Sequence, residues 1–269
     1  MAQDSLTSKI SLSIKNSGKK PAFIPFIVSG YPDLETTGKL LLLLQKHKAA
    51  AIELGIPFSD PLADGPVIQN AAKKAIDNGV TIDKIFGLLQ SLKNDLKTPV
   101  ILFSYINPII RYGFEEFLIK AKDVNVSGVI IPDLPIEESE EFAALCKKYD
   151  MDLIMLVAPT SDKERVLQIS RASKGFIYLV SSTGVTGVRE SFSSVLSELV
   201  KEIKSVSNIP VAVGFGISKP EHILELQNLG VDGAIIGSAL IKIIDNSGND
   251  RNLLLNNISN YINSLYSQV

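Results

Sequence analysis

The residues with the clearest chemical potential lie around one apolar segment near position 53. Glu53 interrupts the apolar run Ala50 to Ile56, and Asp60 and Asp64 follow in a stretch rich in proline and glycine. Burying a carboxylate costs several kcal/mol unless it is paired or protonated, and no lysine or arginine occurs from Ala49 to Ala72. Glu53 is therefore a candidate acid–base residue.

The alternation of side chains along this segment favours a functional role for Glu53. If the large apolar residues of the segment pack against covering helices, Glu53 points to the opposite face together with Ala51 and Gly55. These neighbours are small and leave room for a ligand beside the carboxyl group. The alternative is a structural carboxylate satisfied by a distant arginine or serine, and the small neighbours favour the functional interpretation.

Composition limits the classes of protein to which the chain can belong. Its 269 residues are 45% hydrophobic with a formal net charge of -2, which supplies a large core but no basic surface for nucleic acid or an anionic membrane. No linker-like segment divides the chain, so we expect one domain over residues 1–269. The longest leucine run, Leu40 to Leu44, is too short to span a bilayer, and no secretory signal pattern is present. A cytoplasmic location is expected.

Histidine and cysteine are too scarce for several common mechanisms. Cys146 is the single cysteine, and His47 and His222 are the only histidines. Neither histidine lies near the end of an expected strand, so we expect no Ser-His-Asp catalysis and no metal site. Acid–base chemistry must then depend on carboxylates, tyrosines or lysines.

Eight short apolar runs recur along the chain, each bounded by turn-forming residues. They are continuous rather than alternating, which is typical of parallel strands covered on both faces. Because amphipathic segments separate them, the pattern predicts an α/β fold, a (β/α)8 TIM barrel. The segment Ser5 to Asn16 predicts an added N-terminal helix over the bottom of the barrel. The expected strands are Ala22 to Val28, Ala50 to Ile56, Val100 to Tyr105, Gly128 to Pro132, Leu153 to Ala158, Phe176 to Ser181, Pro210 to Gly214 and Gly233 to Ser238.

A barrel of this kind places chemistry at the carboxyl ends of its strands and often binds phosphate after strands seven and eight. Those strands end in Gly214-Phe215-Gly216 and Gly237-Ser238, where glycine lets backbone N–H groups and a helix N-terminus approach an anion. The nucleotide-binding glycine motifs are absent from the expected positions. The sequence therefore predicts a site for a small phosphomonoester.

Two features near the sixth strand allow more than one interpretation. The segment Ser181 to Glu190 is rich in glycine and hydroxyl groups, as expected either for an active-site lid or for an ordinary loop. Tyr178 precedes it and either packs in the core or points its hydroxyl into the barrel mouth.

The motif Glu53 to Pro66, ELGIPFSDPLADGP, resembles the signature of the tryptophan synthase alpha subunit family. The resemblance extends over nearly the whole chain. Four further segments agree with it: Tyr105 to Ile109, Pro132 to Pro135, Gly184 to Gly187 and Gly214 to Ser218.

The resemblance implies a lyase that cleaves indole-3-glycerol phosphate to indole and glyceraldehyde 3-phosphate with no cofactor in this chain. It also implies an α2β2 complex, with pyridoxal phosphate in the partner beta subunit. The motif positions imply catalytic roles for Glu53, Asp64 and Tyr178. The implied substrate-binding residues are Phe26, Tyr105, Phe215 and Ile235 around the indole, Gly187, Gly216, Gly237 and Ser238 around the phosphate, and Thr186 in the lid. The implied partner contacts are Asp60, Asn107 and Pro135, and Ser182 departs from the arginine or valine of many members.

The residues and the resemblance agree on a retro-aldol mechanism. Glu53 would first protonate indole C3 and then accept a proton from the neighbouring hydroxyl, for which an apolar barrel interior supplies the raised pKa. Asp64 would accept the indole N–H and stabilise the positive ring. Three alternatives are a stand-alone lyase that releases indole, a non-catalytic phosphoester-binding regulatory subunit, and a different phosphosugar barrel such as an isomerase or decarboxylase.

Overall fold

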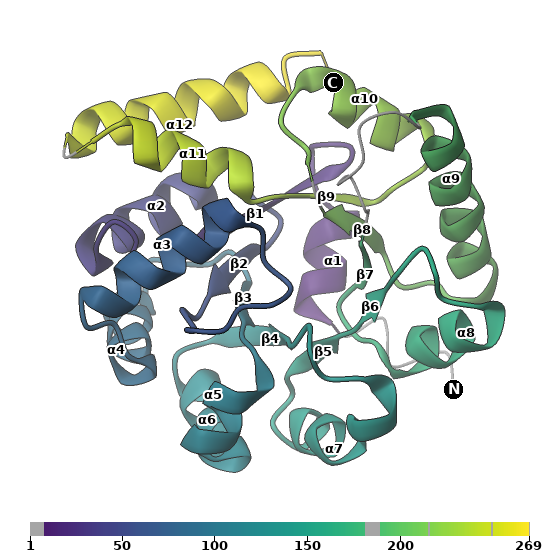
Figure 1. The fold of residues 1–269 in the computed structure, drawn as a ribbon, viewed down its shortest axis with the longest axis horizontal. Helices are drawn as coiled ribbons and strands as arrows, with labels where there is room; N and C mark the ends of the chain where they lie inside the picture. The colour runs from purple at the N-terminus through teal and green to yellow at the C-terminus, as the bar shows by residue number, and fades with distance from the viewer. Residues whose placement is uncertain (1–7, 181–188, 215, 249, 269) are drawn as a thin grey trace.

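Parallel strands form a ring surrounded by helices in the computed structural model (Figure 1). The structure describes residues 8–180, 189–214, 216–248 and 250–268. Within these ranges nine strands pair in the order β5-β4-β3-β2-β1-β9-β8-β7-β6, and every pairing is parallel. This is the predicted TIM barrel. The strands are β1 Ala22–Val28, β2 Ile52–Gly55, β3 Val100–Phe103, β4 Val126–Ile130, β5 Asp152–Ile154, β6 Leu156–Val157, β7 Ile177–Val180, β8 Val211–Gly214 and β9 Gly233–Ile236.

The ninth strand arises because the fifth predicted strand is divided at Met155. Here the Met155 N–H donates a hydrogen bond to the Ser173 hydroxyl (3.1 Å) instead of to a neighbouring strand. The Met155 carbonyl still accepts from the Tyr178 N–H (3.1 Å). As a result β5 pairs with β4, β6 pairs with β7, and the chain between them brings the two edges of the sheet together.

The helices lie outside the strands, and several begin at a side-chain cap. The carboxylates of Asp33 and Asp162 and the hydroxyl of Thr81 accept backbone N–H groups at the starts of α2, α8 and α4, which stabilises the first turn. The helices are α1 Lys9–Lys15, α2 Leu34–Lys46, α3 Pro66–Asp77, α4 Ile82–Leu92, α5 Ile106–Tyr112, α6 Phe114–Asp123, α7 Glu140–Lys148, α8 Lys163–Ala172, α9 Arg189–Val206, α10 Pro220–Asn228, α11 Ser238–Asn246 and α12 Arg251–Leu265, with a 3-10 turn at Ile136–Glu138. In the described part of the chain, none of them has the length and apolar character needed to cross a membrane.

The helix α1 closes the bottom of the barrel, as the sequence predicted for Ser5 to Asn16. It lies in the middle of the ring in Figure 1. Ile10 is fully buried, and its tip lies so close to Gly128 of β4 that a Cβ there would be 2.8 Å away. The Ser11 hydroxyl donates to the carbonyl of Gly175, just before β7 (2.5 Å). These contacts join α1 to the amino-terminal ends of the strands.

Candidate active site

Glu53 is a fully buried carboxyl group in the barrel wall. It lies on β2 in register with Phe26 of β1 and Ile101 of β3. Neither of its oxygens has a hydrogen-bond partner among the described residues. Burial raises the pKa of Glu53 well above its usual range, because the charged form would lose its hydration without gaining a partner. Burial therefore favours the protonated form of this carboxyl group.

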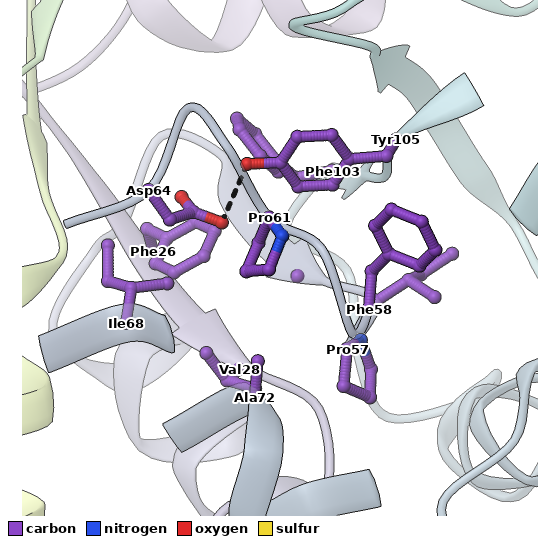
Figure 2. A pocket seen from close by; sticks show the side chains of 12 residues that line it. Phe26, Val28, Pro57, Phe58, Pro61, Asp64, Ile68, Ala72, Phe103 and Tyr105 are labelled. Carbon is purple, nitrogen blue, oxygen red and sulfur yellow. Dashed lines mark hydrogen bonds between the residues drawn. The ribbon is translucent and has the colours of Figure 1, made fainter. Parts of the chain in front are cut away.

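A small pocket with mostly apolar walls is lined by Gly55, two residues after Glu53, and by Phe26, its register partner. Gly55, on the same face of β2, lies against the Phe26 ring, where a Cβ would be 2.8 Å from the ring edge. Figure 2 shows the pocket above, in which Phe26 and Phe103 pack edge to face at 5.4 Å. An apolar pocket with a few polar groups is typical of a small-molecule site, and its aromatic walls suit a flat ring.

Asp64 lies at the rim of this pocket and is held from several sides (Figure 2). Its carboxylate accepts a hydrogen bond from the Tyr105 hydroxyl (3.0 Å), which itself accepts from the Ala63 N–H (2.9 Å). The Gln69 amide of α3 donates to the Asp64 carbonyl (2.9 Å). Burial raises the pKa of Asp64 to about 6, against the lowering effect of the Tyr105 hydrogen bond. At neutral pH Asp64 is mostly an oriented anion.

Tyr178 of β7 packs in the buried core, and its hydroxyl lies against Gly214 at the carboxyl end of β8. It is buried, and any side chain at Gly214 would collide with its hydroxyl. Burial raises the pKa of Tyr178 well above its usual range, and the charges of Glu53 and Asp64 raise it further. Three predicted catalytic residues therefore interact electrostatically inside one barrel, with Tyr178 as a neutral hydroxyl.

Three of the four predicted phosphate residues, Gly216, Gly237 and Ser238, lie where β8 and β9 end. Gly216 adopts a φ of +72° that favours glycine, and Gly237 precedes α11, whose first residue is Ser238. No described side chain caps α11, so its first N–H groups are available to an anion. Ile235 shares its strand face with Gly237 and is buried at this end of the barrel.

The three predicted partner contacts lie on one rim of the molecule. Asp60, Asn107 and Pro135 are exposed and follow the adjacent strands β2, β3 and β4. Leu62, in the same loop as Asp60, is 92% exposed, and Ile110 of α5 is also exposed. Apolar side chains on such a rim are typical of an interface.

Four residues named from the sequence, Ser182, Thr186, Gly187 and Phe215, lie outside the described residues. Two supporting residues were missed. Gln69 holds the Asp64 loop, and Asp133 accepts the Ile106 N–H at the start of α5 (2.9 Å), next to Tyr105. The sequence signal for Asp133 was its place at the end of the fourth strand. In the described part of the chain, no cluster of three or more metal-ligating side chains occurs.

Comparisons with known proteins give one consistent result. The family model described as tryptophan synthase alpha chain matches residues 12–268. A tryptophan synthase alpha chain from Prochlorococcus marinus (strain NATL1A) is 51% identical over 229 residues, covering 85% of this chain and 86% of the relative. One from Arabidopsis thaliana is 46% identical over 234 residues, covering 87% and 85%. A solved structure from Pyrococcus furiosus, described for mutual activation of the tryptophan synthase α2β2 complex, is 37% identical with a TM-score of 0.85, covering 93% and 99%.

Proposed function

The chain belongs to the tryptophan synthase alpha chain family, a lyase of tryptophan biosynthesis that pairs with a beta subunit in an α2β2 complex, and we propose that Glu53, Asp64 and Tyr178 carry its chemistry. The reaction is cleavage of indole-3-glycerol phosphate to indole and glyceraldehyde 3-phosphate. A stand-alone indole-releasing lyase and a non-catalytic regulatory subunit are not favoured by this family membership.

Glu53 supplies and recovers one proton. Its carboxyl group, kept protonated by burial, gives a proton to C3 of the indole ring and forms a C–H bond there. The bond between C3 and the glycerol carbon then breaks, and its electrons return to the ring. The hydroxyl on that carbon loses its proton to the Glu53 carboxylate and becomes the aldehyde of glyceraldehyde 3-phosphate. The acid is thereby restored, as a general acid–base mechanism requires.

Asp64 stabilises the ring while it carries positive charge. Protonation at C3 places the charge on the ring nitrogen, whose N–H donates to the Asp64 carboxylate. Tyr105 holds this carboxylate and Gln69 holds the Asp64 backbone carbonyl before the substrate arrives, so little reorganisation is needed when the charge develops. A charge-assisted hydrogen bond of this kind contributes about 2 kcal/mol or more in a dry site.

Tyr178 and the phosphate residues orient the substrate. The neutral Tyr178 hydroxyl, close enough to be affected by both carboxylates, donates to Glu53 in its anionic form. The N-terminus of α11 with Gly237 and Ser238, together with Gly216, binds the phosphate. Thr186 and Gly187 in the lid and Phe215 at the indole stay predictions from the family motif.

Three further proposals follow from family membership and sequence. Residues 1–269 form one barrel domain, since one family model matches residues 12–268. Pyridoxal phosphate belongs to the partner subunit, because the chemistry above needs only protons and hydrogen bonds from this chain. The complex works in the cytoplasm, as the sequence pattern suggests.

The observation that carries the proposal is the buried carboxyl group of Glu53, which has no partner among the described residues and is in register with Phe26 of the aromatic pocket. The test is indole release from indole-3-glycerol phosphate by the complex, with glycerol 3-phosphate as inhibitor. We expect turnover with competitive inhibition by millimolar glycerol 3-phosphate. Binding of glycerol 3-phosphate without indole release would instead support a regulatory subunit, and neither effect would exclude the site.

A further inference from the structure

A tyrosine, a lysine and an aspartate form a compact cluster beside the active site but outside its pocket. Tyr31, in the loop after β1, is 5% exposed and donates its hydroxyl hydrogen bond to Asp245 of α11. Lys74 of α3 lies 3.1 Å from the same Asp245 oxygen and 3.2 Å from the Tyr31 hydroxyl. Its ammonium group also lies over the Tyr31 ring, 5.3 Å from the centroid. We refer to these three residues as the Asp245 clamp.

The clamp joins the two helices that begin at the two halves of the proposed site. The helix α11 begins at Ser238, at the phosphate end, and α3 begins at Pro66, two residues after Asp64. At 1.5 Å per residue, the clamp lies about 10 Å along α11 and about 12 Å along α3 from these starts. The two helices also pack directly on each other and on β1. Their relative position therefore sets the distance between the phosphate end and the Asp64 loop.

The helix α3 is itself attached to the Asp64 loop. Gln69, in its first turn, donates to the Asp64 carbonyl (2.9 Å). The connection therefore runs from the phosphate end through α11 and Asp245 to Lys74, and through α3 and Gln69 to Asp64. Because packed helices move as stiff elements, a contact between them affects the residues at their ends.

We propose that the Asp245 clamp fixes the spacing between the phosphate end of α11 and the Asp64 loop, so that one substrate molecule reaches both at once. Tyr31, Lys74 and Asp245 are positioning residues in this inference, which rests on the proposed function. None of the three is among the residues that line the pocket. Indole-3-glycerol phosphate carries its indole ring and its phosphate in one molecule. A small change in the distance between α11 and the Asp64 loop therefore lowers its rate of cleavage, because both ends must be placed together for reaction.

The chain contains a second cluster of the same composition that serves as a matched control. Asp83 of α4 accepts from the Tyr112 hydroxyl (2.5 Å) and lies 3.0 Å from the Lys120 ammonium group, which lies over the Tyr112 ring at 5.0 Å. These residues join α4, α5 and α6, and none of them belongs to α3 or α11. The control carboxylate is more exposed, at 67% against 30% for Asp245.

The experiment compares Asp245→Asn with Asp83→Asn in the full α2β2 complex. Binding of glycerol 3-phosphate and of indole is measured separately by calorimetry, and kcat and KM are measured with indole-3-glycerol phosphate. For Asp245→Asn we expect glycerol 3-phosphate and indole, the two half-ligands, each to bind within about twofold of wild type. We expect kcat to fall about tenfold, which is within the range of effects for mutations that couple two sites. Asp83→Asn should leave kcat within twofold. Lys74→Arg, which keeps the ion pair, should retain most of the rate.

Three outcomes would overturn the inference. An unchanged kcat in a folded Asp245→Asn variant would show that spacing does not depend on the clamp. Equal losses in half-ligand binding and in kcat would show general damage to the site. Equal losses of kcat in both aspartate variants would show a stability effect only. If the wild-type complex binds neither half-ligand, the proposed function fails instead, and the two failures are thereby distinguished.

Discussion

The barrel wall around Glu53 and the rim loop around Asp64 differ in the hydrogen bonds that they offer to a carboxyl group. Glu53 is held by strand pairing alone, with no described partner for its oxygens. Asp64 is held by Tyr105 through its side chain and by Gln69 through its backbone. The difference matches the roles that we propose for the two residues. A group that must give and recover a proton is best left without a fixed partner, whereas a group that must meet a charge is best fixed beforehand.

The largest loss of activity should come from replacing Glu53, the proposed proton donor in the barrel wall. Glu53→Gln keeps the shape of the side chain but cannot transfer a proton, and we expect indole formation to fall at least about a thousandfold. Glycerol 3-phosphate should bind within a few-fold of wild type by calorimetry. Asp152→Asn, which changes another buried carboxyl at the opposite end of the barrel, is the control. Near-normal turnover in the Glu53→Gln variant would contradict the proposed mechanism.

The rim carboxylate should matter less than the wall carboxyl. Asp64→Asn can still accept the indole N–H but no longer opposes its positive charge, so kcat should fall about a hundredfold. Steady-state assays of indole formation measure this. A loss of kcat equal to that of Glu53→Gln would contradict the different roles proposed for Glu53 and Asp64.

Removing the hydrogen bond that Tyr105 donates to the Asp64 carboxylate should raise the pKa of Asp64. Tyr105→Phe removes the hydrogen bond that lowers the pKa of Asp64, and kcat/KM at pH 7 should fall about tenfold. In wild type, with that pKa at about 6, activity should decline as the pH falls through 6, because protonated Asp64 cannot stabilise the ring. In the variant this acid limb should move to higher pH.

The control for this profile is Tyr112→Phe, which removes another tyrosine hydroxyl bonded to a carboxylate, Asp83. Its acid limb should stay where it is. An unmoved limb in Tyr105→Phe would mean that Asp64 is not the titrating group.

The smallest effect concerns stability, and it has the opposite sign from the effect on activity. The folded-state pKa of Glu53 is raised above the unfolded value, so the folded state binds the extra proton and loses stability as the pH rises above about 4.3. Glutamine does not titrate. Glu53→Gln should therefore melt about 3 °C above wild type at pH 8, with a smaller difference at pH 4.5. Calorimetric melting at both values checks this, and a lower Tm for the variant at pH 8 would contradict it.

The sequence predicted the position of Glu53 in the barrel wall better than the hydrogen bonds around Asp64 at the rim. The position and burial of Glu53 follow from side-chain alternation within one strand, which is local information. The bond between Tyr105 and Asp64 joins loops that are 41 residues apart, and the clamp bond between Tyr31 and Asp245 spans 214. Such contacts depend on how whole helices pack, which residue patterns do not specify. The break at Met155 has the same origin, because the Ser173 hydroxyl replaces a strand neighbour.

The seal that α1 makes at the bottom of the barrel has a consequence for molecular traffic. Ile10 and Ile14 fill that end, and the Ser13 hydroxyl donates to the Ala50 carbonyl just before β2 (2.6 Å). Among the described residues, α1 therefore closes the bottom of the barrel, which leaves the opposite rim, with Asp60 and Asn107, as the side from which a ligand enters. If the beta subunit docks at this rim, as we propose for Asp60 and Asn107, it covers the route by which indole leaves the barrel.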